Sequence, residues 1–280
     1  MKKSALCIGI NNYPGTGMDL AGCVNDAKDW SAELSARGFT VSALVDAQAT
    51  KAAMVAGLTS LIGGAVSGDV VVITFSGHGT YVPDANGDEI DGLDEAFCPY
   101  DIQNNGAALL DDEIHALFAA RKPGVRLVLI ADSCHSGTVT RAAAPDPDAD
   151  DVPRPRFMPI GNWLPAEQLP KGASGKPLSS VTVTSASSAF TGAMSRAAGD
   201  LLLSGCKEGP NNFSYDARIK GRPNGAFTYY ALKTLKTLKP NATYADWQAA
   251  INPVFLPSAQ YPQSPQIVGS ADARKRKILS

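Results

Sequence analysis

The sequence predicts an α/β fold: a central, mostly parallel sheet of six strands with helices on both faces. Apolar, β-branched runs alternate along the chain with segments of helical periodicity. These runs are continuously apolar, as in strands that are buried on both faces. The runs expected to form strands are residues 4–10, 39–45, 70–76, 125–132, 201–206 and 261–268. The last run contains two prolines and is therefore expected at an edge of the sheet.

Helices are expected between the strands, where apolar residues recur at helical spacing. In the first of these segments the pattern runs from Leu20 to Leu34 and ends before Gly38, a favourable residue after a helix C-terminus. Thr50 is placed to cap the N-terminus of the second helix. The helical segments are residues 19–37, 50–62, 112–120, 226–239 and 244–251.

Composition narrows the class of protein. The chain has 280 residues, 44% of them hydrophobic, which is enough for one large domain. A net charge of −2 gives no reason to expect nucleic acid or an anionic membrane as a partner. No apolar run is long enough to span a membrane, and none has the form of a signal peptide. The five scattered cysteines show neither a disulfide framework nor metal-ligand spacing, so we expect a soluble, cytoplasmic protein.

Two of the expected strands end in small residues around one reactive side chain. The strand at 70–76 leads to His78, and the strand at 125–132 leads to Cys134. A lone cysteine is most often a small buried hydrophobe. Neighbouring parallel strands, however, would bring both side chains to one sheet edge, where α/β proteins place their sites. A histidine beside a cysteine supplies the base and the nucleophile that thiolate attack on a carbonyl requires.

Residues 76–79 read Ser-Gly-His-Gly, and residues 132–137 read Asp-Ser-Cys-His-Ser-Gly. These two segments resemble the catalytic segments of the metacaspases, caspase-like cysteine peptidases of clan CD and peptidase family C14. Caspases have Gln-Ala-Cys at the cysteine, with the histidine at a similar upstream spacing. The resemblance continues in order along the chain at residues 22–27, 88–95, 110–113 and 203–207. It implies a caspase-like three-layer sandwich.

The resemblance also implies roles for particular residues. Cys134 would attack the scissile carbonyl as a thiolate, and His78 would protonate the leaving amine. The backbone amides of Gly79 and Cys134 would form the oxyanion hole. The S1 pocket, which receives the side chain on the N-terminal side of the cut bond, would be formed by Asp26, Ser76 and Asp132, extended by Cys23, Ser214 and Asp216.

Carboxylates in the S1 pocket indicate the substrate class. They favour polypeptides with a basic P1 residue, and they prefer Arg to Lys because a guanidinium binds carboxylates bidentately. An acidic P1 residue, which the caspases prefer, would be repelled. For Asp26 the alternative is a polar helix face. For Asp132, at the end of an apolar strand, a purely structural role is the weaker alternative, because burying a carboxylate without a partner is costly.

We expect a metal site, if the chain has one, in the acidic stretch before the third expected helix. The metacaspase resemblance implies a calcium site with Asp94, Asp111 and Asp112 as ligands. Arg141 stands where many family members have a further carboxylate, and a cation there opposes Ca²⁺. An imperfect EF-hand-like pattern at residues 84–95 has Glu89 where that loop needs glycine. The alternative is a solvated acidic loop.

We expect one caspase-like domain over residues 1–280, comprising a large region at 1–139, a flexible loop at 140–199 and a smaller region at 200–280. The loop carries basic residues at which such an enzyme could cut itself, namely Arg141, Arg154, Arg156, Lys171, Lys176 and Arg196. The resemblance favours a monomer. One rival hypothesis is a peptide-binding or regulatory protein on the same fold that does not turn substrate over. A second rival, a doubly wound ligand-binding protein, lacks the glycine-rich phosphate loop that it needs.

Overall fold

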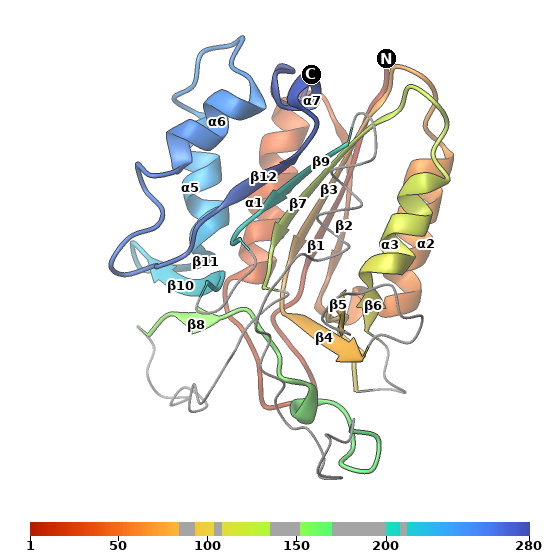
Figure 1. The fold of residues 1–280 in the computed structure, drawn as a ribbon, viewed down its shortest axis with the longest axis vertical. Helices are drawn as coiled ribbons and strands as arrows, with labels where there is room; N and C mark the ends of the chain where they lie inside the picture. The colour runs from red at the N-terminus through yellow and green to blue at the C-terminus, as the bar shows by residue number, and fades with distance from the viewer. Residues whose placement is uncertain (84–92, 104–107, 135–151, 170–199, 208–211) are drawn as a thin grey trace.

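The fold is built around a six-stranded sheet in the order β12-β9-β7-β3-β1-β2 (Figure 1). The computed structural model describes residues 1–83, 93–103, 108–134, 152–169, 200–207 and 212–280. The strands of this sheet are β1 (Lys3–Gly9), β2 (Thr40–Val45), β3 (Val70–Ser76), β7 (Arg126–Asp132), β9 (Leu201–Ser204) and β12 (Gln266–Gly269). All pairs are parallel except β12 with β9. The predicted mostly parallel sheet is confirmed, including the last strand at an edge.

Helices cover both faces of the sheet, as the sequence predicts (Figure 1). One face carries α1 (Cys23–Ala36), α5 (Ala226–Leu235) and α6 (Tyr244–Ile251), and the other carries α2 (Lys51–Gly63) and α3 (Asp111–Ala119). A further helix, α7 (Ala271–Arg274), and two 3₁₀ turns (Asp46–Gln48 and Ile160–Asn162) complete the described helical segments.

The strand β3 shows why its apolar run is continuous. Ile73 and Phe75 belong to the core cluster under α2 and α3, whereas Val70 and Val72 belong to the cluster under α1 and α5. Successive side chains of a strand point to opposite faces, so a strand covered on both faces buries every position. All seven residues of β3 are accordingly buried.

The first helix begins later than its apolar pattern predicts. The Oδ1 atom of Asn11 accepts hydrogen bonds from the N–H groups of Cys23 and Val24, which fixes the start of α1 at Cys23. Residues 19–22 form a loop instead, and Gly22 donates its N–H to Asp216. The cap of α2 agrees with the prediction, since Thr50 Oγ1 accepts a hydrogen bond from Ala53 N.

Two small sheets lie at the carboxyl end of the main sheet, and the sequence analysis missed both (Figure 1). One consists of β4 (Gly79–Pro83), β5 (Leu93–Phe97) and β6 (Leu109–Leu110); the other consists of β8 (Arg154–Pro155), β10 (Tyr215–Ile219) and β11 (Arg222–Gly225). Their strands are short, and several carry charged or proline residues, so they show no strand periodicity. These sheets add the surfaces around the candidate site.

Part of the expected flexible loop packs into the protein. Within residues 152–169, the side chains of Phe157, Met158, Ile160 and Trp163 are buried in the core cluster under α2 and α3. The charged and proline-rich composition before Phe157 obscures this apolar group. Residues 140–151 and 170–199 of the expected loop, with Arg141, Lys171, Lys176 and Arg196, lie outside the described residues.

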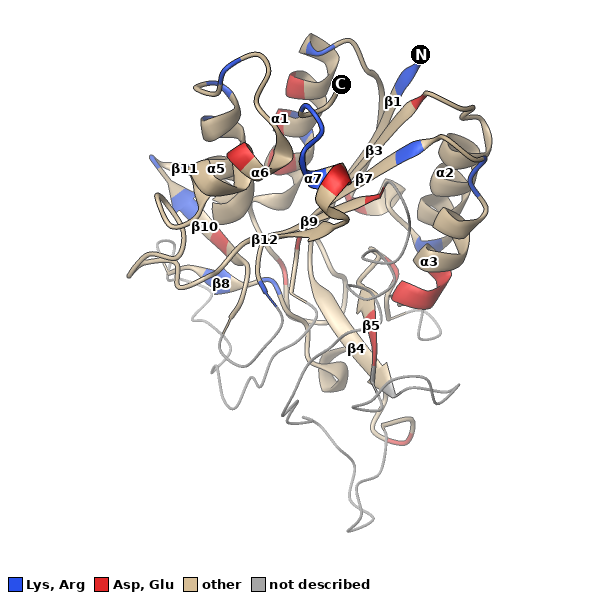
Figure 2. Ribbon diagram, turned by 45° about the horizontal axis from the view of Figure 1, so that its top comes forward, with Lys and Arg blue, Asp and Glu red and all other residues tan. Residues whose placement is uncertain are grey.

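Charged residues of both signs are interspersed over the helices (Figure 2). A blue segment beside α7 corresponds to the basic run at residues 274–277. In the described parts of the chain, no helix has the length and apolar character required to cross a membrane.

Candidate active site

The candidate site lies where two adjacent strands end. Strands β3 and β7 pair in parallel register, with Ser76 opposite Asp132. His78 and Cys134 each follow two residues later, so the two expected catalytic residues leave the same edge of the sheet. Both are almost completely buried, with 1% and 0% of their surface exposed.

His78 is held as a neutral imidazole. Its Nε2 atom lies 2.7 Å from the carbonyl oxygen of Met18, and because a carbonyl only accepts, Nε2 carries the proton. The Nδ1 atom is then the basic nitrogen, and it is buried with no geometrically defined hydrogen-bond partner among the described residues. The Tyr13 ring packs at 4.9 Å from the imidazole, and its hydroxyl accepts the backbone N–H of His78. Burial lowers the pKa of His78 to about 4, so the ring is uncharged at neutral pH.

The depressed pKa of His78 predicts a pH-dependent stability. The ring has a pKa of about 4 in the folded chain and an ordinary value of 6.5. Between these values the unfolded chain binds a proton that the folded chain does not, so the free energy of unfolding falls as the pH decreases from 6.5 to 4. In urea unfolding of the Cys134→Ala chain, we expect this contribution to be on the order of 3 kcal/mol.

The matched variant for this measurement is His78→Gln in the same Cys134→Ala background. Burial raises the pKa of both Asp26 and Asp200 to about 6. The contribution of these two carboxyls to the free energy of unfolding therefore decreases as the pH rises from about 4 to 6. These carboxyls are present in both chains, so the difference between the two chains isolates His78. Equal pH dependence of unfolding in the two chains would contradict the assignment.

Among the described residues, the hydrogen-bond partners of the Cys134 thiol are Ser214 and Cys206, and His78 is not one of them. The Cys134 sulfur accepts the N–H of Ser214 at 2.6 Å and lies 3.8 Å from the sulfur of Cys206. Burial raises the pKa of the Cys134 thiol well above its ordinary value, and Cys206 raises it further. The thiol is therefore protonated at neutral pH, and it needs a base to become a nucleophile.

Two backbone amides beside these residues converge on one carbonyl oxygen. Gly79 N and Cys134 N donate to the carbonyl oxygen of Arg156 at 3.0 and 3.1 Å. Paired amide donors aimed at one carbonyl are the geometry that stabilises the oxyanion of an acyl-transfer reaction. The structure thus brings together the two amides that the resemblance assigns to the oxyanion hole.

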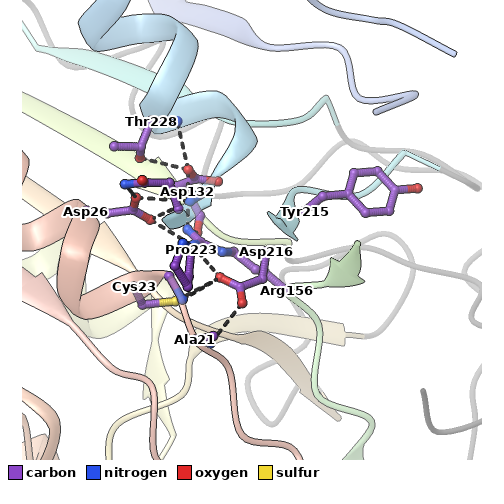
Figure 3. Close-up of polar contacts among 12 residues, drawn as sticks. Ala21, Cys23, Asp26, Asp132, Arg156, Tyr215, Asp216, Pro223 and Thr228 are labelled. Carbon is purple, nitrogen blue, oxygen red and sulfur yellow. Dashed lines mark hydrogen bonds and ion pairs between the residues drawn. The ribbon is translucent and has the colours of Figure 1, made fainter. Parts of the chain in front are cut away.

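The side chain of Arg156 fills a pocket of carboxylates (Figure 3). Its Nη2 atom lies 2.7 Å from Asp26 and 2.9 Å from Asp216, and its Nη1 atom lies 3.3 Å from a carboxylate oxygen of Asp132. The guanidinium is completely buried, at 0% exposure. The carboxylates come from α1, β7 and β10, so three distant segments build a single cation-binding pocket.

Neighbouring donors orient the pocket carboxylates. Asp26 accepts the N–H of Gly225 and the side-chain amide of Asn224. Asp132 accepts the N–H and hydroxyl of Thr228 at 2.9 and 2.7 Å and the hydroxyl of Ser214 at 2.6 Å. These contacts hold the Asp26 and Asp132 carboxylates in place around the guanidinium. Burial raises the pKa of Asp26 to about 6; the Arg156 guanidinium opposes this rise, and the neighbouring Asp132 carboxylate adds to it.

The other expected pocket residues surround this group. Ser76 ends β3 beside Asp132, and Cys23 begins α1 with its sulfur 4.0 Å from a carboxylate oxygen of Asp216. Ser214 links the pocket to the nucleophile, since its hydroxyl bonds Asp132 and its N–H bonds the Cys134 sulfur. Sequence reasoning missed Asn224, Gly225 and Thr228, for which the chain offers no local signal.

The expected calcium ligands belong to the small β4–β5–β6 sheet and to the helix that follows it. Asp94 is on β5, and Asp111 and Asp112 begin α3, directly after β6, which pairs with β5. Within the described ranges, no three or more His, Cys, Asp or Glu side chains form a group that could hold a metal ion. The described residues therefore do not fit a calcium site by themselves, and we assign calcium no step. Residues 84–92 and Arg141 lie outside the described residues, and the calcium site stays a prediction.

The mostly parallel sheet, with the candidate histidine and cysteine after the carboxyl ends of adjacent strands, has the arrangement expected of a caspase-like cysteine peptidase. Residues 3–143 match the family model described as the metacaspase, peptidase C14 domain. The chain is 31% identical to Metacaspase-1 of Mycosarcoma maydis, in an alignment that covers 96% of this chain and 70% of that protein. It is 32% identical to Metacaspase-1 of Cryptococcus neoformans var. neoformans, covering 96% and 62%.

A solved structure shares the fold of this chain. The crystal structure of protein GSU0716 from Geobacter sulfurreducens matches with a TM-score of 0.69 and 28% sequence identity, covering 100% of this chain and 99% of that chain. This chain belongs to the metacaspase family and is a cysteine-type peptidase, a hydrolase. It spans between 62% and 70% of the length of the two fungal relatives.

Proposed function

We propose that this metacaspase is an endopeptidase that cuts polypeptides after Arg or Lys, using Cys134 and His78. The observation that supports it most directly is the placement of Arg156. Its guanidinium occupies the carboxylate pocket while its carbonyl oxygen accepts two amide hydrogen bonds beside the candidate nucleophile. A substrate bound in the same way would present the bond after a basic residue.

The dyad would act in the order that its protonation states allow. Neutral His78 takes the thiol proton, and the Cys134 thiolate attacks the carbonyl carbon. The amides of Gly79 and Cys134 hold the oxyanion, after which the imidazolium returns a proton to the leaving amine. Water then hydrolyses the thioester. Among the described residues, no hydrogen bond joins Cys134 to His78, and catalytic hydrogen bonds are often formed only when substrate is bound.

The pocket predicts a rank order of P1 residues. Arg makes separate contacts with Asp26, Asp132 and Asp216, whereas the single ammonium of Lys cannot match this fork. We therefore expect kcat/KM for peptides with P1 Arg to exceed that for P1 Lys by roughly 10-fold. We expect it to exceed that for P1 Asp by about 10³-fold or more, because an acidic P1 side chain would be buried against carboxylates of the same charge.

Peptides that differ only at P1 test this order. Each is assayed with added Ca²⁺ and with a chelator. A preference for P1 Asp would contradict the pocket assignment, and activity that a chelator leaves unchanged would remove the calcium prediction. Binding of Arg peptides without any cleavage would favour the rival hypothesis, a peptide-binding protein on this fold.

Other expectations from the sequence stay predictions. They are a monomeric state, a cytoplasmic location, self-processing within residues 140–199, and the absence of nucleic-acid and membrane partners.

A further inference from the structure

We propose that the chain carries a binding site for a free anion with two or more phosphate groups, built on Arg121, Arg126 and Arg276. The site lies at the edge of the main sheet where the parallel strands begin. This edge is at the opposite end of β7 from Cys134, so the inference goes beyond the proposed function.

A hollow of about 680 Å³ lies where three arginine-bearing segments meet. Arg121 follows α3, Arg126 begins β7, and Arg276 follows α7. The lining is completed by Ala119, Pro123, Gly124 and Val125. The volume falls within the range of sites that take small ligands, about 300–1,000 Å³.

Backbone hydrogen bonds hold two of these arginines in place. The N–H of Arg126 donates to the carbonyl of Asp69 at 3.0 Å. The N–H of Arg276 donates to the carbonyl of Ala273, and its carbonyl accepts the N–H of Tyr244, both at 3.2 Å. The guanidiniums therefore extend from a fixed main chain, and a ligand would bind without the cost of ordering it.

One buried carboxylate is shared by two of the arginines. The Nη1 atom of Arg121 lies 3.0 Å from a carboxylate oxygen of Asp200, which is completely buried. Burial raises the pKa of Asp200 to about 6, and both Arg121 and Arg276 oppose this rise. A single carboxylate can balance one of these two charges, and Asp200 does not line the hollow.

The third arginine has uncharged partners. The Nη2 atom of Arg126 donates to the carbonyl of Gly68 at 3.4 Å and to the sulfur of Met1 at 3.3 Å. Neither group carries a negative charge. A phosphate oxygen would be the stronger acceptor, because hydrogen bonds between charged groups are about twice as strong as those between neutral ones.

Further cations gather along the same edge of the sheet. Lys3 begins β1, and the strand register places it in one row with Val70 and Arg126. Burial lowers the pKa of Lys3, and Lys277, Arg37 and Arg126 lower it further. Figure 2 shows Lys and Arg segments close to both marked chain ends. The net charge of the chain is −2, so this positive potential is local, and it would attract an anion.

Phosphate suits these arginines better than a carboxylate does. The planar guanidinium binds phosphate bidentately. A phosphate monoester also carries a charge of about −1.5 to −2, against −1 for a carboxylate. Because the arginines come from three segments around one hollow, a ligand with several phosphate groups can reach all of them.

Isothermal titration calorimetry with sodium tripolyphosphate tests the site. The Cys134→Ala chain is used, so the result does not depend on peptidase activity. We expect saturable binding at a single site. Arg126→Gln and Arg276→Gln should each weaken this binding by roughly 10-fold or more, the effect of losing a charge-assisted hydrogen-bond donor. Arg276→Lys keeps the charge without the fork and should bind with intermediate affinity.

Lys275→Gln and Lys122→Gln are the matched controls. Each removes one positive charge from an exposed residue that is next in sequence to a lining arginine. They should change the affinity by no more than about 2-fold, because exposed charges contribute little. Equal weakening by Lys275→Gln and Arg276→Gln would overturn the site. Thermal unfolding checks that every variant is folded.

A series of anions tests the chemistry of the ligand. Affinity should rise from orthophosphate through pyrophosphate to tripolyphosphate. Hexaglutamate presents carboxylates on a peptide instead of phosphates. If hexaglutamate bound as tightly as tripolyphosphate, the assignment to phosphate would be wrong, and if tripolyphosphate showed no saturable binding, there would be no site.

A lipid headgroup would present the same phosphate chemistry as a free anion. Cosedimentation with vesicles that contain phosphatidylinositol bisphosphate separates the two sources. We expect the chain to stay in the supernatant, because the ligand has to enter a hollow between three segments. Sedimentation that Arg126→Gln abolishes would overturn the assignment to a free anion.

Thermal unfolding gives a second readout of binding. Bound tripolyphosphate would join the segment after α3 to the segment after α7, so it should raise the unfolding temperature with increasing concentration. The rise should be smaller for Arg126→Gln than for Lys122→Gln, and equal rises would contradict the site. Neither readout uses peptide hydrolysis, so failure of the anion site leaves the proposed function untouched. A chain that binds tripolyphosphate but cuts no peptide would overturn the proposed function alone.

Discussion

Cys134→Ala is expected to abolish hydrolysis of peptides with P1 Arg, lowering kcat by 10⁴-fold or more, as removal of a catalytic nucleophile does in other hydrolases. Cys134 is the thiol beside the two amides that converge on a carbonyl. His78→Ala is expected to act similarly, because the buried, protonated thiol then lacks its base. The loss should not add in the double variant, since the two residues act as a unit. The measurement is steady-state hydrolysis of an Arg peptide by each variant.

Cys7→Ala is the matched control for the loss of a buried thiol. Cys7 lies on β1 in the core cluster under α1 and α5, away from the site. It should retain wild-type kcat, and thermal unfolding should show that Cys7→Ala and Cys134→Ala are both folded. Residual activity of Cys134→Ala within about 10-fold of wild type would exclude Cys134 as the nucleophile, and a full additive loss in the double variant would exclude the dyad.

Asp26→Asn is expected to remove much of the discrimination between a P1 Arg and its neutral isostere citrulline. The Asp26 carboxylate lies 2.7 Å from the guanidinium in the pocket, with 0% of either side chain exposed. Loss of one buried charge partner should lower the ratio of kcat/KM for Arg to that for citrulline by roughly 30-fold or more. Because it is a ratio measured on one enzyme preparation, it does not depend on the fraction of protein that is folded.

Asp29→Asn is the comparison on the same helix. Asp29 pairs with Arg222 at a partly exposed position, one turn along α1 from Asp26. It should change the Arg-to-citrulline ratio by no more than about 3-fold, because a partly exposed ion pair contributes little and Asp29 reaches the pocket only through Asn224, whose Nδ2 atom bonds both Asp29 and Asp26. If the Arg-to-citrulline ratio were unchanged in Asp26→Asn, or fell equally in both variants, the pocket would not be what discriminates a charged P1 side chain from a neutral one.

The sheet could be predicted from sequence because buried parallel strands leave continuous apolar runs. The positions of His78 and Cys134 followed from the ends of two such runs. The role of Arg156 could not be predicted in the same way. It depends on pairing with β10, and β8 has only two residues, so no periodicity marks it. Its neighbourhood, rich in proline and charge, was interpreted as part of a flexible loop.

The pocket carboxylates illustrate a second limit. Asp26 and Asp132 were expected in S1 by resemblance, but their orienting partners are on β11 and α5, far along the chain. Such contacts arise only when the tertiary fold is complete. The late start of α1 has a related cause, because a side-chain cap from Asn11 overrode the apolar pattern.

The order of the main sheet has a consequence for biosynthesis. Strands β1, β2, β3 and β7 are complete once residue 132 has been made, but the outer partner of β7 is β9, which starts at residue 201. At typical elongation rates the ribosome takes several seconds to make the intervening chain. During that interval the β9 side of β7 has not yet received its partner strand, and such an edge can pair with another nascent chain. Slow translation between these two strands should therefore favour aggregation of the unfinished protein, and a chaperone that shields the edge should raise its yield.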